Sequence, residues 1–401
     1  MYTTLAILGG FLWFYSVVAP RVERTLISGP ILFVAFGLIM GPGVLNLLPL
    51  KTDVEVLSTL AELTLALVLL TDAAGADLTV LSRTKELPIR LLAIGLPLTI
   101  GLGFLAGWAI YPGLPLLEVA LLAAILAPTD AALGKAVVTN DAVPSSMRQG
   151  LNVESGLNDG ICVPVVILFL TLISGEDHNN TPVATGLALF AQAVGIGLAV
   201  GTIFSTLAVW LLHFSKHHHW MSPVWSKVHL LALAFTCFGT AQALGGSGFI
   251  ACFVAGLIFG HLYRPHHSAL LDAAEGIGDA FALLTWVLFG AIAVDAIFAG
   301  FSWQAFLYAI LSLTLIRMLP VFLALTRLVK DTQSKLFIGW FGPRGLASIV
   351  FIVMAIDEKV PNADVLQQAV VYTVVLSILL HGITANPWAN AIGKRSGATQ
   401  G

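Results

Sequence analysis

Long apolar runs occupy most of this sequence, and they limit what the chain can fold into more strongly than any other feature. A helix needs about 20 predominantly apolar residues to span the hydrocarbon core of a bilayer. About 13 such runs occur, at residues 2–19, 27–49, 54–71, 88–111, 115–139, 148–174, 183–212, 228–245, 248–263, 279–298, 303–326, 335–356 and 366–391. Because a backbone in lipid must satisfy its own polar groups, these runs predict an all-α polytopic membrane protein.

The composition indicates the same fold class. Only 10% of the residues are charged, whereas a soluble domain has about a quarter. Since so few charges cannot cover a water-facing surface, we expect a lipid bilayer around most of the chain. The net charge of −3 contains no basic block and gives no support to nucleic-acid binding. The first run lacks the pattern of a cleaved signal peptide, so we expect residues 2–19 to be a spanning helix.

Positively charged residues set the expected orientation, because cytoplasmic loops carry an excess of Lys and Arg. If the loops are numbered from the first run, the odd loops and the C-terminus carry about 15 of these residues. The even loops carry only Lys51 and Lys359. The sequence therefore predicts a multi-pass protein of the cell (plasma) membrane with its N-terminus outside and its C-terminus in the cytoplasm.

A faint internal repeat divides the chain in two. Residues 33–41 echo residues 253–260 with one gap, at an offset of about 219. Proline interrupts two runs at nearly the same offset, at Pro128 and Pro343. With run 183–212 as a linker, these echoes predict two inverted repeats with discontinuous helices 5 and 12, a pattern typical of transporters. The alternative for each single proline is a harmless kink.

Ionisable residues inside membrane spans are costly, so they are functional candidates by default. The first stretch that contains one is Ala127-Pro128-Thr129-Asp130. Proline removes an amide donor and frees an upstream carbonyl, and free carbonyls such as that of Thr129 suit a hard monovalent cation. Asp130 then precedes a half-helix, where a carboxylate offsets the positive helix end. The alternative is that Asp130 is only a helix cap.

The second stretch lies in the sixth run. Helical spacing places Glu154 next to Asn158, and Ser155 next to Asp159, on adjoining ridges. If this helix begins near Arg148, Asp159 lies about 16 Å along it, close to the middle of the bilayer. A solvated acidic loop is the alternative, but the apolar run continues beyond these residues without a turn.

Two arginines also fall inside spans, and a buried guanidinium needs a carboxylate partner. Arg317 lies near the middle of the eleventh run, and Glu154 is its best candidate partner. The alternative is that Arg317 snorkels to the membrane interface. Arg344 lies in the second proline break, Gly342–Gly345, where Asp130 is the expected counter-charge.

The histidines and cysteines carry less information. Five histidines lie between residues 213 and 229, where a solvated loop and a pH sensor are both open. His381, inside the last run, is interpreted as a core histidine with satisfied hydrogen bonds rather than as a ligand. The three cysteines lie in apolar runs and are interpreted as core residues, not as a metal site.

Together, these motifs resemble the NhaP-type sodium/proton antiporters, the electroneutral branch of the monovalent cation:proton antiporter superfamily. The motifs that carry the resemblance are Pro128-Thr129-Asp130, Glu154-Ser155 followed by Asn158-Asp159, Arg317, and Gly342-Pro343-Arg344-Gly345. The resemblance covers nearly the whole chain and implies one transmembrane domain, residues 1–401, in which the unwound helices 5 and 12 cross. It also implies dimerisation helices, residues 1–87 and 183–298, beside an ion-transporting core, residues 88–182 and 299–391.

The resemblance also implies the ions and their ligands. The substrates would be protons and a monovalent cation, Na+ or else Li+ or K+. Asp159 resembles the residue that holds the cation and the proton in turn. The residues that resemble further Na+ ligands are Thr129, Asp130, Glu154 and Ser155. No cofactor is implied, and the protein would be a secondary transporter and a homodimer, not an enzyme.

Three further residues would support the site. Asn158 resembles the family asparagine that braces it, and Arg317 resembles the arginine that pairs with the glutamate. Arg344 would add positive charge at the second break. Because Asn158 cannot titrate and Arg317 holds Glu154, one exchangeable charge remains, which predicts electroneutral one-for-one exchange. The sequence carries no long cytoplasmic tail, so we expect no regulation through one.

Two other functional classes stay open at this point. A cation channel would need filter repeats and a wide polar pore helix, which the sequence lacks. An intramembrane hydrolase would need a catalytic pair, and Asp130 with Asp159 superficially resembles one. The arginines inside the membrane argue against a hydrolase, because they keep carboxylates ionised.

Overall fold

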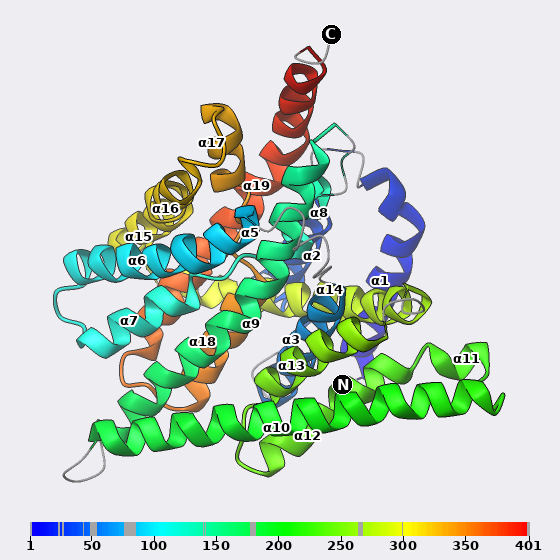
Figure 1. Cartoon of the computed structure of the whole chain (residues 1–401). Helices are drawn as coiled ribbons and strands as arrows, with labels where there is room; N and C mark the ends of the chain where they lie inside the picture. The colour runs from blue at the N-terminus through cyan, green and yellow to red at the C-terminus, as the bar shows by residue number, and fades with distance from the viewer. Residues whose placement is uncertain are drawn as a thin grey trace.

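The computed structural model describes residues 2–22, 25, 28–42, 44–48, 54–75, 86–138, 140, 142–176, 182–263, 268–298 and 300–398. Within these ranges every regular element is a helix (Figure 1). The first half contains α1 (Tyr2–Val22), α2 (Gly29–Met40), α3 (Val54–Gly75), α5 (Glu86–Arg90), the π-helix η2 (Leu91–Gly95), α6 (Leu96–Ile110), α7 (Leu116–Ile125), α8 (Ala131–Val138) and α9 (Ser145–Glu176). The second half contains α10 (Pro182–His217), α11 (Pro223–Ser226), α12 (His229–Ala243), α13 (Gly248–Leu262), α14 (Ser268–Phe298), α15 (Trp303–Leu313), α16 (Leu315–Leu325), α17 (Thr332–Trp340), α18 (Leu346–Asp357) and α19 (Ala363–Ala398).

The all-α polytopic fold predicted from the apolar runs is confirmed, since each run contains one or more helices. Among the described residues, eight helical segments are long and apolar enough to cross a membrane. Four shorter apolar helices, α2, α7, α13 and α18, lie in other runs. The orientation stays a prediction, because several of the loop cations that set it lie outside the described residues: Arg24, Lys51, Arg83, Lys85 and Arg264.

Several predicted spans differ from the structure in length or continuity; the helix of run 279–298, for example, already begins at Ser268. The run 27–49 is helical only as far as Met40, because Gly41 and Pro42 follow and do not continue a helix. The run 54–71 continues as a helix to Gly75. The run 303–326 is two helices, because Thr314 adopts φ −110° and ψ −93° between them. Each correction comes from local backbone geometry, which hydropathy does not report.

The boundary between α12 and α13 is a true turn within a nearly continuous apolar stretch. Gly245 has φ +75°, a left-handed conformation that favours glycine. Ser247 then caps α13, because its side-chain oxygen accepts a hydrogen bond from the amide of Ile250 at 3.3 Å. The runs 228–245 and 248–263 are therefore separate helices, as predicted.

The helices form two groups that pack mainly within themselves. In the first group α13 packs on α3, α10 and α12, and α14 packs on α2 and α3. In the second group α7 packs on α6 and α9, α15 and α18 pack on α19, and α16 packs on α17. Contacts of α9 with α10 and α3, and of α18 with α3, join the groups. In Figure 1 the long helix α10 runs along one side of the molecule with α12 beside it.

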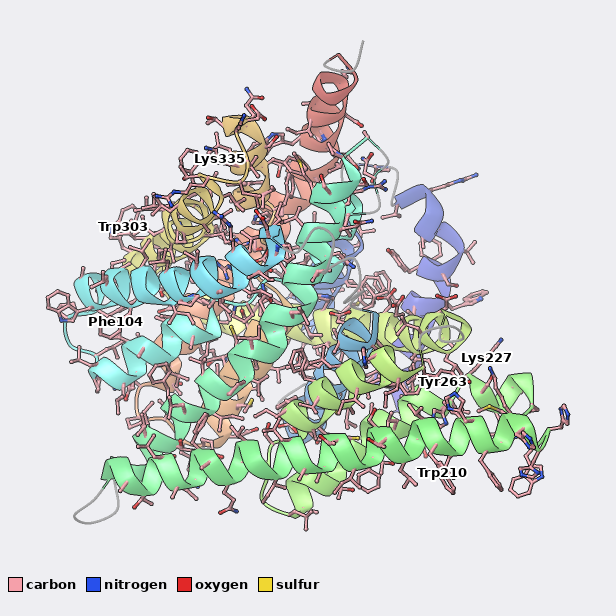
Figure 2. The ribbon with its side chains drawn as sticks, viewed as in Figure 1. Phe104, Trp210, Lys227, Tyr263, Trp303 and Lys335 are labelled. Atoms are coloured by element: carbon pink, nitrogen blue, oxygen red, sulfur yellow. The ribbon has the colours of Figure 1, made fainter. Side chains whose placement is uncertain are left out.

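The outer surface carries large apolar side chains. Trp13 on α1, Trp210 on α10 and Trp303 on α15 are 75%, 58% and 62% exposed. Figure 2 shows Trp210 and Trp303 on the outside of their helices. A water-facing surface seldom carries so many such side chains, whereas a lipid-facing surface requires them.

Glycine allows the closest contact between α2 and α14. A Cβ atom on Gly37 would collide with the backbone carbonyl of Val287. A Cβ atom on Gly290 would collide in the same way with the carbonyl of Val34. Small residues that let backbones approach are a general device of helix packing in membranes.

The contact between α13 and α3 repeats this arrangement. Cβ atoms on Gly256 and Gly260 would collide with backbone carbonyls of α3. Gly37 and Gly256 correspond at the offset of the sequence repeat, and so do Gly41 and Gly260. In each half the second predicted span therefore packs on the third predicted span of the other half, α2 on α14 and α13 on α3, which supports the two predicted repeats.

We expect Gly290→Ala to lower the stability of the protein, because the added methyl group forces α2 and α14 apart. Overpacking of this kind costs about 1–3 kcal/mol. The matched control is Gly276→Ala in the same helix, where a Cβ would meet nothing within 4 Å. The thermal unfolding of both variants in detergent tests this, and equal midpoints for the two would contradict it.

Candidate cation site

Two helix breaks lie at the centre of the site. The first, between α7 and α8, contains Pro128, and the second, between α17 and α18, contains Pro343. Proline lacks the amide donor that would continue a helix and leaves an upstream carbonyl unpaired. The breaks predicted for helices 5 and 12 are therefore present, and backbone polar groups are exposed to each other inside the protein.

Asp130 joins the two breaks. Its amide donates to the carbonyl of Pro343 at 2.7 Å. Its carboxylate accepts from the amide of Leu133 in α8 at 3.0 Å and from the amide of Leu346 in α18 at 2.7 Å. Asp130 thus caps two half-helices that come from different halves of the chain. A Cβ on Gly345 would collide with this carboxylate, so the position accommodates only glycine.

Arg344 crosses from the second break to the first. Its Nη1 donates to the carbonyl of Ala127 and to that of Pro128, the latter at 3.1 Å. Within the described part of the chain, its Nε and Nη2 are buried without a hydrogen-bond partner. The predicted pairing of Arg344 with Asp130 is therefore not the contact formed: the guanidinium binds the carbonyls of Ala127 and Pro128 at the first break, and Asp130 accepts amides.

Glu154 and Arg317 form a buried ion pair. Nη1 of Arg317 donates to Oε1 of Glu154 at 2.7 Å, and Nη2 donates to Oε2 at 2.8 Å. Both side chains are almost completely buried. The predicted pairing is confirmed, and the alternative of a snorkelling arginine is wrong. Arg317 lies in the first turn of α16, directly after the kink at Thr314, and this kink was not predicted.

Asn158 connects this ion pair to the first break. Its Nδ2 donates to Oγ1 of Thr129 at 2.6 Å and to Oε1 of Glu154 at 3.5 Å, and its Oδ1 accepts from the amide of Thr129 at 3.2 Å. Ser155 donates to the carbonyl oxygen of Thr129 at 2.6 Å. Helix α9 thereby fixes both the backbone and the hydroxyl of Thr129.

Asp159, in contrast to Glu154 and Asn158, has no hydrogen-bond partner for its buried Oδ1 in the described part of the chain. Its side chain is 5% exposed. It lies within electrostatic range of Asp130, Asp72 and Arg344. Since buried acceptors are almost always satisfied, an oxygen of this kind is a place where a cation or a proton would bind.

Asp72 also lies at the candidate site, although the sequence did not predict it there. Its Cβ packs against Gly156 on α9, where an added Cβ would come within 3.1 Å of it. It therefore lies one helical turn from Asp159 and interacts electrostatically with it. The predicted third span ended one residue before Asp72, at Thr71. An acidic residue directly after an apolar run was the signal that could have indicated it.

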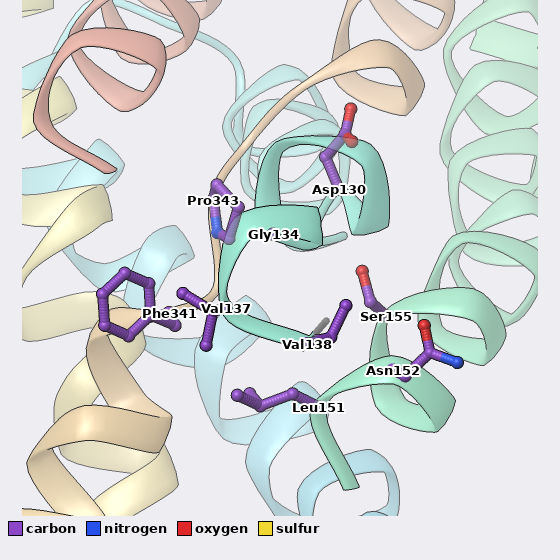
Figure 3. Close-up of a pocket in the computed structure, with 9 residues that line it drawn as sticks. All are labelled: Asp130, Gly134, Val137, Val138, Leu151, Asn152, Ser155, Phe341 and Pro343. Atoms are coloured by element: carbon purple, nitrogen blue, oxygen red, sulfur yellow. The ribbon is translucent and has the colours of Figure 1, made fainter. Parts of the chain in front are cut away.

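A small cavity opens beside the site (Figure 3). Its volume is about 10 Å³, which is near the minimum that one water molecule needs. Figure 3 shows Ser155 and Asn152 of α9 on one side of it, with Pro343 and Phe341 on the other. The residues that line it are Asp130, Gly134, Val137, Val138, Leu151, Asn152, Ser155, Phe341 and Pro343.

The ligand types at the site suit a hard, weakly held ion. The candidate donors are the carboxylate of Asp159, the hydroxyl of Ser155, and the carbonyl and hydroxyl of Thr129. Among the described residues, no group of three or more His, Cys, Asp or Glu side chains is arranged to hold a resident metal ion. An oxygen-rich site with an unpaired carboxylate oxygen suits the reversible binding of a monovalent cation.

Comparison with known proteins identifies the family. The profile of the family described as sodium/hydrogen exchanger, transmembrane, matches residues 10–391. The chain belongs to the sodium/hydrogen exchanger family. The matched region contains both helix breaks and every candidate residue, so the resemblance to sodium/proton antiporters inferred from the motifs is confirmed.

Individual relatives of this exchanger-family chain are distant. A probable Na(+)/H(+) antiporter of Schizosaccharomyces pombe is 25% identical over 420 residues, which are 94% of this chain and 54% of that protein. The K(+)/H(+) antiporter NhaP2 of Shewanella baltica is 22% identical over 387 residues, which are 94% of this chain and 64% of that protein. The chain thus spans between half and two thirds of their length. The structure of the sodium proton antiporter MjNhaP1 from Methanocaldococcus jannaschii matches with a TM-score of 0.74 at 23% identity over 98% of both chains, which supports the fold.

We expect Glu154→Gln and Arg317→Ala each to destabilise the protein by about 3–5 kcal/mol, because each leaves one buried charge unpaired. The double variant should be less destabilised than the sum of the two. Thermal unfolding in detergent measures this cycle, with the exposed Arg327→Ala as a control that should change little. Additive effects would mean that the two side chains do not stabilise each other.

Proposed function

We propose that this chain exchanges a monovalent cation, Na+ or else Li+ or K+, for protons. The observation that carries the proposal is the unpaired Oδ1 of Asp159, buried where two helix breaks meet. Membership of the sodium/hydrogen exchanger family supports it, and so do relatives named Na(+)/H(+) and K(+)/H(+) antiporters.

The cation binds to Asp159 together with the oxygens of Ser155 and Thr129. The hydroxyl of Ser155 donates to the carbonyl of Thr129 in this structure, and a turn of that hydroxyl frees both oxygens for the cation. A proton on Asp159 converts the same carboxylate into a neutral donor. Cation and proton therefore exclude each other at one side chain, which is the requirement for exchange. Asp72, one helical turn away, is a second acidic ligand candidate.

Two of the neighbouring carboxylates, those of Glu154 and Asp130, are held by fixed donors, which favours one-for-one exchange. Both oxygens of Glu154 are engaged by Arg317, so Glu154 supports the site through Asn158 and is a weaker candidate for direct contact with the cation. Asp130 caps two half-helices and interacts electrostatically with Asp159, so it is a further candidate ligand. With Asp159 as the exchanging group, the cycle moves one charge in each direction and is electroneutral.

The two groups of helices suggest which part of the protein carries the site and which part supports it. Residues 88–182 and 299–391 form the carrier in this proposal, and residues 1–87 and 183–298 form the scaffold and the contact with a second copy. The mainly internal packing of each group supports the division. The homodimer lies in the cell membrane, with its N-terminus outside and its C-terminus in the cytoplasm.

The other two functional classes fit the geometry less well. A hydrolytic aspartate dyad would need Asp130 to share a proton with Asp159, whereas both oxygens of Asp130 accept backbone amides. A channel would need a continuous wide pore, whereas the cavity beside the site has room for about one water molecule. Both observations favour a carrier.

Asp159→Asn is expected to abolish exchange of every monovalent cation, because the amide can neither release a proton nor carry a charge. The protein should still fold, since Asn has nearly the same shape. Proton movement in proteoliposomes after addition of NaCl, LiCl or KCl measures the activity. The exposed Asp364→Asn at the start of α19 is the matched control and should exchange normally. Exchange by the Asp159 variant would refute the assignment.

Electroneutrality predicts that a membrane potential leaves the balance of gradients unchanged. In proteoliposomes with a set proton gradient, the sodium gradient that stops net exchange should be the same with and without a clamped potential. If the balance point moves with voltage, a second proton is carried. Asp72→Asn and Asp130→Asn would then identify its site, because only the responsible variant would restore a balance point independent of voltage.

A further inference from the structure

Helix α19 bonds to both ends of the second break through two side chains. Both ring nitrogens of His381 lie within hydrogen-bond distance of a partner. Nε2 lies 2.8 Å from the carbonyl oxygen of Trp340, the last residue of α17. Its Nδ1 lies 3.2 Å from the hydroxyl of Ser377. Ser377 in turn accepts from the amide of Arg344 at 2.7 Å. The interpretation of His381 as a satisfied core histidine is confirmed, but its partners belong to the break.

Two carbonyl oxygens face the ring of His381. Nε2 lies 2.8 Å from the carbonyl oxygen of Trp340, and Nδ1 lies 2.9 Å from that of Ser377, one helical turn back on α19. A carbonyl oxygen only accepts, so the bond to Trp340 places a proton on Nε2. The hydroxyl of Ser377 accepts from the amide of Arg344. The two side chains thus hold the carbonyl at the end of α17 and the amide of Arg344, near the far end of the break.

Ser377 and His381 are suited to this task by their spacing. They lie four residues apart on α19, so they share one face of the helix. Both are buried, at 0% and 2% exposure. The indole Nε1 of Trp340 adds a third link, because it donates to the hydroxyl of Thr384 at 2.9 Å, one turn further along α19.

We propose that Ser377 and His381 form a clamp that positions the cation site. The clamp sets the path of the backbone from Trp340 to Arg344. That path places the carbonyl of Pro343 against Asp130, and the guanidinium of Arg344 against the carbonyls next to Thr129. The clamp acts on the cation only through these groups, so Ser377 and His381 are positioning residues. This inference rests on the proposed function for its effect on transport, but not for its effect on structure.

Transport kinetics give the first test, in proteoliposomes with Na+ as the probe. Ser377→Ala and His381→Ala should raise the Na+ concentration for half-maximal exchange by about tenfold, the effect of losing one buried hydrogen bond. His381→Gln keeps an N–H donor for Trp340, and Ser377→Thr keeps the hydroxyl, so both should stay close to the wild type. The matched control is Thr373→Val, which removes a buried hydroxyl of α19 that bonds only to its own helix, at Ala369.

Amide hydrogen exchange gives a second test that does not depend on transport. In detergent, the peptide that covers residues 341–346 should exchange at least tenfold faster in Ser377→Ala and His381→Ala than in the wild type or in Thr373→Val. Unchanged exchange of this peptide would overturn the clamp, and so would an unchanged half-maximal Na+ concentration in an active protein. A wild-type chain that exchanges no cation would overturn the proposed function instead, and the peptide would still decide on the clamp.

Discussion

Two helices that break inside a membrane leave backbone groups without partners, and the rest of this structure depends on how those groups are paired. An unsatisfied backbone group in hydrocarbon costs several kcal/mol. Here each break supplies what the other lacks: the amide of Asp130 binds the carbonyl of Pro343, and Arg344 binds the carbonyls of Ala127 and Pro128. Neither break is stable alone, so the two halves of the chain must meet at this point.

Much of this arrangement could be predicted from the sequence, because charge and proline inside a membrane span have few explanations. Pro128 and Pro343 indicated both breaks, and the cost of a buried guanidinium led from Arg317 to Glu154, which the structure pairs in a bidentate contact. The glycine echo between residues 37 and 256 indicated the repeat, and both glycines allow close helix contacts. These features follow from the energy of single residues, which hydropathy and helical spacing capture.

The residues that the sequence reasoning missed depend on packing between distant segments. Asp72 lies at the end of an apolar run, and only its contact with Gly156 on α9 brings it to the site. Arg344 was expected to bind Asp130, but two backbone amides compete for that carboxylate, and the carbonyls of Ala127 and Pro128 compete for the guanidinium. The choice between a charged and a backbone partner is set by the local three-dimensional geometry, which a linear pattern does not contain.

The dense pairing around Asp159 has a consequence for selectivity and speed. Glu154, Asn158 and Thr129 are held by donors and acceptors in fixed positions, so the site needs little rearrangement when its occupant changes. The proposed exchange benefits from this property, because binding energy spent on ordering the ligands would lower the net affinity for the cation. The carboxylate of Asp159, whose buried Oδ1 has no hydrogen-bond partner among the described residues, would then set the balance between proton and cation, while the fixed groups keep the surroundings the same for both. A rigid frame around a single exchangeable charge is therefore the physical basis of the mechanism that we propose for moving two different ions.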